Sequence, residues 1–253
     1  MDIKIIVATH KKYQMPDDPM YIPLQVGAEG KEDLGYTKDN TGDNISSKNK
    51  NYCELTGLYY MWKNMVSDYK GLVHYRRHFI SSDAKGDKTD RIIKKEELEI
   101  ILKETDIIVP KKRHYYIETN YSQYAHAHHH VDLDVTRNII EEKYPDYIPS
   151  FDKVMKKTYG HRFNMFVMKS EKLDEYLTWM FDILFELEKR IDISGYSAND
   201  SRIFGFVSER LLDVWLDKTG YDYKEQPYAF MEKQNWIIKG SRFLLRKIGI
   251  KQR

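Results

Sequence analysis

The chain passes from an apolar run into a cluster of cations and aromatic rings over residues 70–79, Lys70-Gly71-Leu72-Val73-His74-Tyr75-Arg76-Arg77-His78-Phe79. Buried strands end where the chain reaches solvent. In open α/β sheets, ligands bind in the crevice beyond the carboxyl ends of the strands. We therefore expect a strand that ends near His74, with Arg76 and Arg77 placed to bind phosphate or carboxylate groups. The alternative is a strand end whose charges are simply solvated.

Short apolar runs alternate with helical patterns along the rest of the chain. Residues 3–8 are β-branched and almost continuously apolar, which is typical of a buried parallel strand. Residues 13–50 show little periodicity and are expected to form a long, partly irregular loop. Strands are also expected at 106–110 and 163–168, and helices at 53–66, 94–103, 135–143, 201–216 and from an N-cap at Ser170. This order predicts an α/β domain with a mixed, mainly parallel sheet.

The composition restricts the class of protein. With 253 residues, 41% of them hydrophobic, the chain can form one large domain or one domain with an appendage. The net charge of +2 gives no general attraction to nucleic acid. The 20 tyrosines suit hydroxyl-rich ligands, because an aromatic ring packs on the apolar face of a sugar. The single Cys53 excludes an internal disulfide and fits a cytoplasmic protein, and we expect no signal peptide or membrane-spanning run.

A histidine-rich segment has two interpretations. It reads His126-Ala127-His128-His129-His130-Val131-Asp132. Imidazoles and a carboxylate this close could bind a divalent metal ion. Adjacent residues cannot all point at one ion, however. We therefore favour a polar loop that faces a sugar, with one or two histidines as donors or as a proton shuttle.

The last expected helix combines a polar stripe with apolar faces. Arg202, Gly205 and Glu209 share one side, and most other positions are apolar. A carboxylate on a helix that is buried nearly all round is costly unless a cation or hydrogen-bond donor pairs with it, or unless it has a catalytic or binding role. Glu209, or Asp200 at the helix start, could act as a general base, and a structural ion pair is the alternative. Asn164 interrupts an apolar strand, so it needs hydrogen bonds to a ligand or to a neighbouring backbone group.

The end of the chain is basic and amphipathic. From Lys233 it combines apolar and aromatic residues with seven Lys or Arg. We divide the chain into a domain over residues 1–225 and a basic amphipathic extension over 226–253, whose helix would suit an anionic membrane surface. A closing helix packed on the domain is the alternative. The sequence contains no Walker loop, Gly-x-Gly-x-x-Gly, Cys-x-x-Cys or Gly-x-Ser-x-Gly motif, which argues against several common enzyme classes.

Several blocks together resemble a bacterial family first catalogued as a domain of unknown function and found in capsule and exopolysaccharide gene clusters. The most specific are Asn-Tyr-Cys-Glu-Leu-Thr-Gly-Leu-Tyr at 51–59 and Gly-Leu-Val-His-Tyr-Arg-Arg at 71–77. Further blocks lie at 128–134, 160–166 and 202–216, and the resemblance covers residues 3–220. The family is regarded as glycosyltransferases and includes β-1,3-galactofuranosyltransferases that use UDP-galactofuranose. The resemblance implies a GT-A-like fold, a single nucleotide-sugar-binding α/β domain.

The resemblance also implies roles for individual residues. In the GT-A fold the end of the first strand usually holds the nucleobase and ribose, which here means Ala8, Thr9 and His10. We expect the donor to be bound by Thr9, His10, Tyr52, Glu54, Thr56, His74, Arg76, Arg77, Asn164 and Arg202. We expect the acceptor to be bound by His128, His129 and His161. The catalytic base would be Glu209 or Asp200, with Asp132 and Glu54 as further candidates, and a single displacement implies inversion.

The chain departs from the GT-A pattern at one point. A later strand in that fold usually ends in Asp-x-Asp, which binds the metal ion that neutralises the diphosphate. Here that strand is followed by Arg76 and Arg77, and Asp132-Leu133-Asp134 follows the histidines instead. We therefore expect no required cofactor beyond the UDP-sugar donor, with a divalent metal ion as the less favoured alternative. The two guanidiniums would stabilise the charge that develops on the departing UDP.

Two other classes of function remain open. The same aromatic and cationic loops could serve a carbohydrate- or nucleotide-binding module without catalysis, and residues 126–130 could serve a metal-dependent hydrolase. For the enzyme, galactofuranose is the best guess for the transferred hexose. The acceptor would be a growing cell-surface polysaccharide or a lipid-diphosphate-linked oligosaccharide. We expect a cytoplasmic location, with peripheral contact to the inner face of the membrane through the tail as an option.

Overall fold

A nine-stranded mixed sheet forms the centre of the protein. The computed structural model describes residues 1–82 and 85–232. Along the sheet the strand order is β10-β6-β9-β4-β1-β2-β3, and β5 and β11 pair beyond this path. The strands are β1 Ile3–Thr9, β2 Tyr21–Gln25, β3 Thr37–Lys38, β4 Tyr69–His74, β5 Arg77–Phe79, β6 Ile107–Pro110, β9 Phe166–Lys169, β10 Lys224–Gln226 and β11 Tyr228–Phe230. A separate two-stranded ribbon pairs β7 Arg113–His114 with β8 Tyr159–Gly160. Strands β1, β2, β3 and β4 run parallel to one another, as do β6 and β10, whereas β9 is antiparallel to both β4 and β6. This gives the mixed, mainly parallel sheet expected from the sequence.

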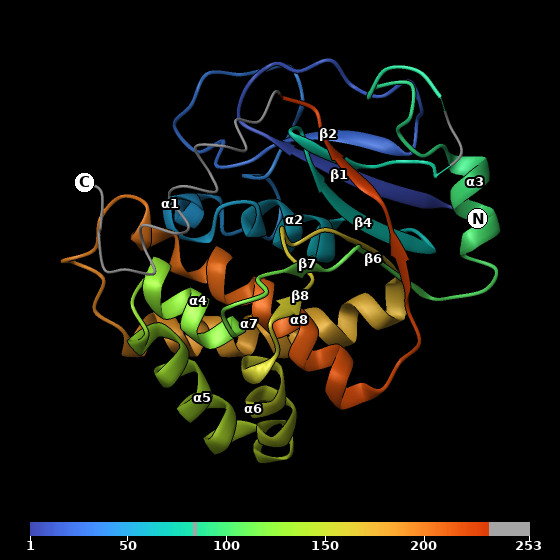
Figure 1. The fold of residues 1–253 in the computed structure, drawn as a ribbon. Helices are drawn as coiled ribbons and strands as arrows, with labels where there is room; N and C mark the ends of the chain where they lie inside the picture. Colours follow the sequence, from blue (N-terminus) through green and yellow to red (C-terminus); the bar gives the residue numbers. More distant parts are fainter. Residues whose placement is uncertain (83–84, 233–253) are drawn as a thin grey trace.

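The helices lie mostly on one face of the sheet. Figure 1 shows α2, α7 and α8 beneath the strands, with α4, α5 and α6 further out and α3 apart from them at the right of the view. The α-helices are α1 Asn49–Tyr52, α2 Leu55–Asn64, α3 Lys95–Ile101, α4 Asn120–Ala127, α5 Val131–Lys143, α6 Ile148–Lys156, α7 Ser170–Arg190 and α8 Ile203–Thr219. Single 3₁₀ turns cover Ser46–Lys48, Pro145–Tyr147 and Asp200–Arg202. The described residues form a single domain.

Alternation along the central strands produces two cores. Ile6 and Ala8 of β1 face the core shared with α2, α7 and α8. Ile5 and Val7 face a second core, which includes Leu98 of α3. Successive strand side chains point to opposite faces, and both sets are completely buried, so β1 is continuously apolar from Ile5 to Ala8.

The expected loop over residues 13–50 is irregular in part, but it also contains β2, β3 and, from Ser46, a 3₁₀ turn and the start of α1. Residues 21–25 form β2, which pairs parallel with β1. The strand was not predicted because it contains Pro23. Proline lacks the N–H that would donate a hydrogen bond to a neighbouring strand, so it argues against a strand in the sequence. Strand β3 pairs only with Leu24 and Gln25, so the position of Pro23 is not opposite β3 and the missing donor is tolerated.

Other boundaries also differ from expectation, and the helix expected at 135–143 begins earlier, at Val131. The strand expected at 163–168 starts at Phe166, because Phe163 and Asn164 have φ values of 79° and 51° and form a turn. Ser170 is the first residue of α7 and does not cap it, since its hydroxyl donates to the carbonyl of Ser67. The helix expected from 201 begins as the 3₁₀ turn over Asp200–Arg202.

The sheet continues past residue 225, where we expected the domain to end. Strand β11 pairs antiparallel with β5, so Tyr228, Ala229 and Phe230 belong to the sheet. The basic amphipathic helix expected in the tail falls on residues 233–253, which lie outside the described residues. Across the described residues, every helix is too short or too polar to cross a membrane.

Candidate active site

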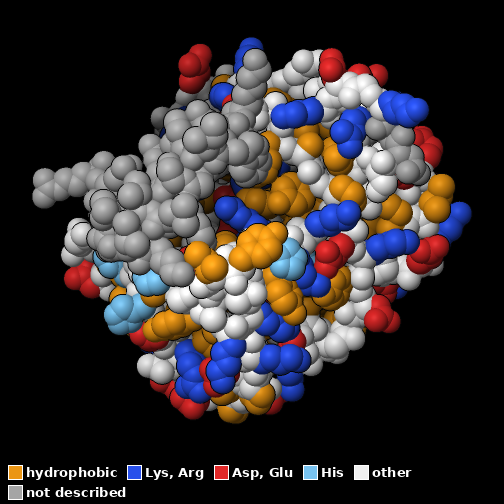
Figure 2. All heavy atoms as spheres, in the orientation of Figure 1, with side chains coloured by type: hydrophobic (Ala, Val, Ile, Leu, Met, Phe, Trp, Pro, Cys, Tyr) orange, Lys and Arg blue, Asp and Glu red, His pale blue; other side chains and the backbone are white. Residues whose placement is uncertain are grey.

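A strongly cationic cavity opens where β4 turns into β5, and its volume is about 320 Å³. It lies between the β4–β5 turn, the loop ahead of β9 and the first turns of α8. Its lining consists of Cys53, Glu54, His74, Arg76, Arg77, Arg113, Tyr115, Gln123, His128, Arg162, Phe163, Arg202, Gly205, Phe206, Glu209, Arg210 and Phe230. Six arginines therefore face two carboxylates. We call this cavity the arginine pocket. Figure 2 shows Lys and Arg side chains beside hydrophobic ones near the centre of this face.

A tight hairpin brings the first cations into the arginine pocket. The sheet pairs His74 at the end of β4 with Arg77 at the start of β5. The N–H of Arg76 donates to Nδ1 of His74 at 3.2 Å, so Nε2 carries the proton of the neutral ring. Burial, with Arg77 and Arg76 adding to it, lowers the pKa of His74 to about 2. His74 is therefore a neutral donor at physiological pH.

Four of the six arginines lie against aromatic rings and have no carboxylate partner among the described residues. The guanidinium of Arg77 is 4.2 Å from the ring centre of Phe163. The other pairs are Arg76 with Tyr75 at 5.3 Å, Arg113 with Tyr115 at 5.7 Å and Arg202 with Phe206 at 5.4 Å. Stacking orients a guanidinium without neutralising it. These four charges remain available to an anionic ligand.

Arg77 shows the cost of this arrangement. Its Nε is buried and has no hydrogen-bond partner among the described residues. Burial lowers the pKa of its guanidinium, and Glu54 and Glu209 only partly oppose this. A buried charge without a partner is unfavourable. An anion bound beside Arg77 would relieve that cost.

The remaining two arginines are tied into the protein interior. Arg162 donates to Asp213 Oδ2 at 3.1 Å and from Nε to the Tyr115 hydroxyl at 3.0 Å. Arg210 donates to the carbonyl of Phe206 and to Gln123. Both are 3% exposed. They add positive potential to the pocket wall and hold α8 and α4 around it.

One turn fixes both carboxylates of the arginine pocket. The N–H of Phe163 donates to Glu209 Oε1 at 3.1 Å. Asn164 Nδ2 donates to Glu54 Oε1 at 2.9 Å and to the carbonyl of Gly205. Glu209 also lies 3.2 Å from Arg210. Asn164 thus has the hydrogen bonds that the sequence required, although they join it to Glu54 and α8.

His128 enters the arginine pocket with Asp200 behind it. Its Nδ1 is 3.0 Å from Asp200 Oδ1, and its ring stacks on Phe206 with 4.1 Å between centroids. Burial lowers the pKa of His128 to about 4, although Asp200 opposes this shift. The neutral ring then donates from Nδ1 to Asp200 and leaves Nε2 as an acceptor. Asp200 itself does not line the pocket.

Four residues expected at the donor site lie outside the arginine pocket. Thr9 is buried, and its hydroxyl donates to the carbonyl of Lys11. Tyr52 stacks on Phe204, and its hydroxyl is 3.1 Å from Glu188. Thr56 donates to Asp39, and His10 packs edge-on against Tyr75. Thr9, Tyr52 and Thr56 are completely buried, whereas His10 is exposed.

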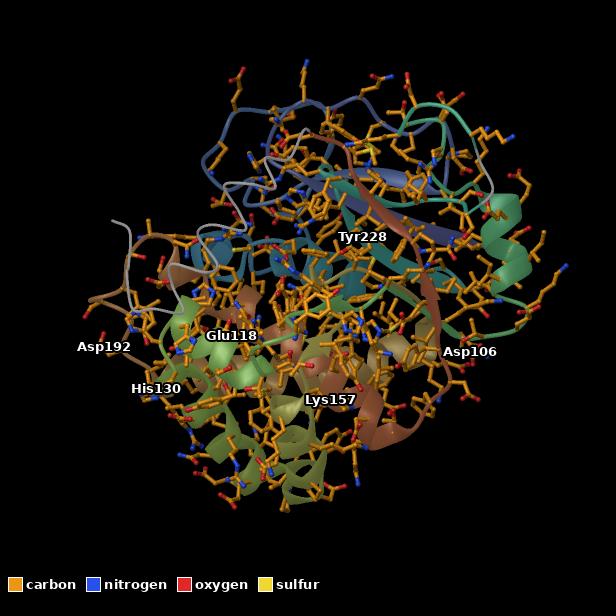
Figure 3. All side chains as sticks on the ribbon, viewed as in Figure 1. Asp106, Glu118, His130, Lys157, Asp192 and Tyr228 are labelled. Atoms are coloured by element: carbon orange, nitrogen blue, oxygen red, sulfur yellow. The ribbon has the colours of Figure 1, made fainter. Side chains whose placement is uncertain are left out.

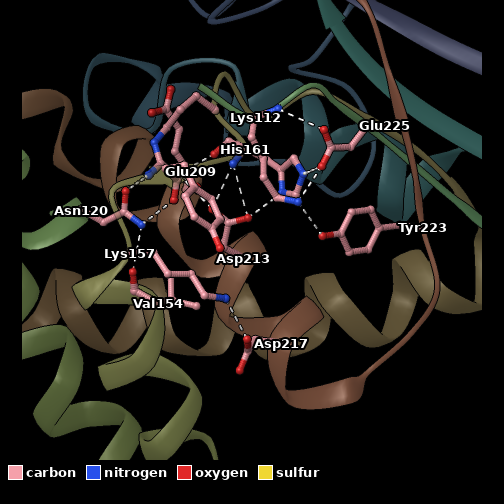
Figure 4. A network of polar contacts seen from close by, with 12 residues as sticks. Lys112, Asn120, Val154, Lys157, His161, Glu209, Asp213, Asp217, Tyr223 and Glu225 are labelled. Atoms are coloured by element: carbon pink, nitrogen blue, oxygen red, sulfur yellow. Dashed lines mark hydrogen bonds and ion pairs between the residues drawn. The ribbon is translucent and has the colours of Figure 1, made fainter. Parts of the chain in front are cut away.

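The other expected residues are also outside the arginine pocket. Asp132 is completely buried and accepts from the hydroxyls of Tyr124 and Tyr196 at 2.6 and 2.7 Å. Burial raises its pKa. His129 stacks on Tyr196. Figure 4 shows the buried His161 between Asp213 and Glu225, with Tyr223 beside it. Its Nδ1 is 2.6 Å from Asp213.

The histidines of residues 126–130 have separate partners. His126 contacts Glu118, and His130 is 2.8 Å from Asp134. Figure 3 shows His130 at the outer edge of the helical layer, far from Tyr228 of β11. Within residues 1–82 and 85–232, no three His, Cys, Asp or Glu side chains gather into a possible metal site. His126, His128 and His130 are each paired with a different carboxylate instead.

The sequence did not single out Arg113, Arg162 or Arg210 as site residues. Arg210 follows Glu209 on a helix that is apolar nearly all round. Two adjacent charged residues on such a helix were the one feature of the sequence that could have indicated Arg210 as a site residue. Arg113 lies on β7, a two-residue strand that no periodicity reveals. Arg162 reaches the pocket only because Asp213 and Tyr115 hold its side chain, which no local pattern shows.

The fold and this pocket define a single mixed α/β domain with a cationic cavity at the carboxyl ends of its parallel strands. Residues 4–220 match the model of the family described as DUF4422, a domain of unknown function. The chain belongs to this family. No curated protein matches the chain. Among solved structures, the apo structure of WbbM, a bifunctional glycosyltransferase, is similar, with 30% sequence identity over 92% of this chain and a TM-score of 0.84. The chain spans 46% of the length of that protein.

Proposed function

We propose that the chain is a glycosyltransferase that moves a hexose from a UDP-sugar to a hydroxyl of a polysaccharide or oligosaccharide acceptor. The structural similarity to WbbM, a glycosyltransferase, supports the class of reaction. The observation that carries the proposal is the set of four stacked arginines without carboxylate partners in the described residues. Arg76, Arg77, Arg113 and Arg202 provide the planar donors that a diphosphate accepts.

The departing diphosphate is the group whose charge most needs stabilisation. Cleavage of the sugar–phosphate bond leaves negative charge on UDP, and fixed cations in a partly buried site stabilise it. Arg77 and Arg76 lie at the mouth of the β4–β5 turn, and the neutral His74 adds a hydrogen-bond donor beside them. In this proposal the guanidiniums do the work usually done by a metal ion. Activity should persist in EDTA, and a complete loss restored by added metal would contradict this step.

The acceptor hydroxyl must lose a proton as it attacks the anomeric carbon. Glu209 leads as the base, because it lines the pocket and the Phe163 N–H fixes its orientation. Glu54 is second, since it also lines the pocket and Asn164 holds one of its oxygens. Asp200 would act through His128. A single displacement by this route inverts the configuration of the transferred sugar.

Galactofuranose remains the proposed sugar, and a lipid-diphosphate-linked oligosaccharide at the inner membrane face the proposed acceptor. Calorimetry with UDP and a panel of UDP-sugars, with Mn²⁺ or with EDTA, tests the donor. Donor hydrolysis or transfer in the same samples tests catalysis. We expect micromolar to millimolar binding of UDP and measurable turnover of one donor. Absence of UDP binding under both conditions would refute the proposal.

A non-catalytic nucleotide- or carbohydrate-binding module is the second candidate. The same stacked arginines favour it, because they explain binding without any chemistry. The two functions separate cleanly in one experiment. A binding module shows a higher melting temperature with UDP but releases no sugar from any donor, whereas the enzyme does both.

A further inference from the structure

A row of aromatic rings leads away from the arginine pocket along the β7–β8 ribbon. The rings of Tyr116 and His114 lie 5.9 Å apart, and those of His114 and Tyr159 lie 5.5 Å apart. Lys112 continues the row, with Nζ 5.9 Å from the ring of Tyr159 and 5.3 Å from that of Tyr223. We call Tyr116, His114, Tyr159 and Tyr223 the aromatic track.

The aromatic track ends in a second cavity of about 310 Å³. Its lining includes three tyrosines, Tyr159, Tyr221 and Tyr223, together with Lys112. Arg113, the next residue, lines the arginine pocket. Consecutive Cα atoms are about 3.8 Å apart, so only the width of β7 separates the two cavities. Arg113 and Lys112 point to opposite faces of β7, so a sugar chain that passes over the edge of this two-residue strand would reach both cavities.

The start of the track is exposed and strained. Tyr116 is 84% exposed and Ile117 is 54% exposed. Tyr116 has a φ of 59° in a three-residue turn that the N–H of Ile117 closes on the carbonyl of Tyr115 at 2.7 Å. Such turns are rare for a residue with a side chain, and strained backbone concentrates at ligand sites. The core gains nothing from this ring, because it faces solvent.

The charges along the track are balanced, unlike those of the arginine pocket. Lys112 Nζ is 2.6 Å from Glu225, and Lys157 is 2.9 Å from Asp217. An anionic ligand would have to displace these carboxylates. A neutral, hydroxyl-rich ligand fits better, because its ring faces stack on tyrosine while its hydroxyls bond to the paired charges. This is the chemistry of a sugar chain.

We propose that the aromatic track and the cavity beyond it bind the acceptor glycan, several sugar units away from the hydroxyl that reacts in the arginine pocket. The inference rests on the proposed function for the identity of that hydroxyl. It adds that the acceptor is a chain of at least three neutral sugars. Tyr116 and Tyr159 would each carry one sugar ring by stacking.

The test measures retention on an array of neutral glucose, galactose, mannose and rhamnose oligomers of one to six sugars. We expect the wild-type chain to bind at least one oligomer of three or more units and not its monosaccharide. The Tyr116→Ala, Tyr159→Ala double variant should lose about tenfold or more in affinity, equivalent to about 1.4 kcal/mol. Tyr116→Phe should bind as wild type, since the ring face is kept. Tyr60→Ala, on α2 outside both cavities, is the matched control.

The readouts separate failure of this inference from failure of the proposed function. UDP binding should be unchanged in the double variant, because neither tyrosine lines the arginine pocket. No retention of any oligomer by wild type, equal retention by the double variant, or displacement of the glycan by UDP would each overturn the inference. A chain that binds glycan through the track but never UDP would instead refute the donor site.

Discussion

The backbone N–H of Phe163 donates to Oε1 of Glu209 with 3.1 Å between nitrogen and oxygen, although a φ of 79° is unfavourable for phenylalanine. The next residue, Asn164, also has a positive φ and donates its side-chain amide to Glu54. Two strained residues thus position both carboxylates of the arginine pocket. Strain of this kind persists only where the surrounding structure enforces it.

Removal of Arg77 should weaken UDP binding without loss of stability. We expect Arg77→Ala to raise the Kd of UDP by about 10-fold or more, because a charge-assisted contact to phosphate is lost. The melting temperature of the ligand-free protein should change little, because the lost stacking on Phe163 is offset by removal of a guanidinium whose buried Nε has no partner in the described structure. Calorimetry and thermal unfolding measure the two effects. Arg190→Ala, at the end of α7, removes the same charge outside the pocket, and an equal loss of UDP binding there would argue against a specific contact.

Amide substitutions should identify the base. Glu209→Gln keeps an oxygen that can accept from the Phe163 N–H, so we expect kcat to fall by about 10²-fold or more with a modest change in KM. Asp132→Asn should retain near-normal kcat, because Asp132 is sealed behind Tyr124 and Tyr196. A collapse of kcat in Glu54→Gln alone would transfer the role to Glu54. Normal kcat in both glutamine variants and in Asp200→Asn would remove all three candidates.

The Asn164 turn can be divided into a backbone part and a side-chain part. Asn164→Ala and Asn164→Gly both remove the hydrogen bond to Glu54, so kcat should fall by a similar factor in each. Glycine tolerates the positive φ and alanine does not, so the glycine variant should be more stable by about 1 kcal/mol. Urea unfolding and steady-state kinetics give the two numbers. A fall in kcat in Asn164→Ala but not in Asn164→Gly would mean that activity depends on the backbone conformation of the turn and not on the hydrogen bond to Glu54.

The buried Asp213 should set part of the acid stability of the fold. Burial alone would raise its pKa, but His161 and Arg162 overcome this and hold the pKa below the usual aspartate value. A depressed folded-state pKa stabilises the protein above the unfolded-state pKa, and the contribution is lost as the pH falls through the folded-state pKa. Asp213→Asn should cost about 3–5 kcal/mol at pH 7, since it leaves Arg162 buried without its carboxylate.

Urea unfolding from pH 7 down to pH 2 checks this prediction. The gap between wild type and Asp213→Asn should narrow as the solution is acidified below the usual aspartate range. Asp217→Asn is the control, because its lysine partners, Lys153 and Lys157, can return to solvent. A gap between wild type and Asp213→Asn that does not change with pH would contradict the assignment.

The parts of the molecule that the sequence predicted are those with strong local patterns. Strand β4 and its cationic end follow from an apolar run that stops at His74, and the helix with Arg202 and Glu209 follows from its periodicity. The cationic segment follows the carboxyl end of the parallel strand β4, as expected, and Arg202 and Glu209 line the same pocket. Strand β2 was not predicted, because a proline at position 23 argues against a strand. The structure tolerates Pro23 because β3 pairs only with Leu24 and Gln25.

The remaining pocket residues depend on long-range contacts. Arg162 becomes a wall of the pocket through Asp213, which is 51 positions away in sequence. Arg210 depends on Gln123 from another helix. The spacing of residues in the sequence does not reveal such distant partners. Arg162 and Arg210 could therefore not be assigned to the protein interior or to the site from the sequence. The positive φ of Phe163 also could not be predicted from local sequence, because the N–H of Phe163 donates to Glu209, which is distant in sequence.

The unneutralised guanidiniums also act beyond contact distance. Arg76, Arg77, Arg113 and Arg202 gather like charge beside low-polarity aromatic walls, and such clefts focus field lines toward bulk water. A doubly charged nucleotide would be drawn in before any hydrogen bond forms. Its capture rate should therefore drop steeply as ionic strength rises toward physiological salt, where the Debye length shrinks to about 8 Å.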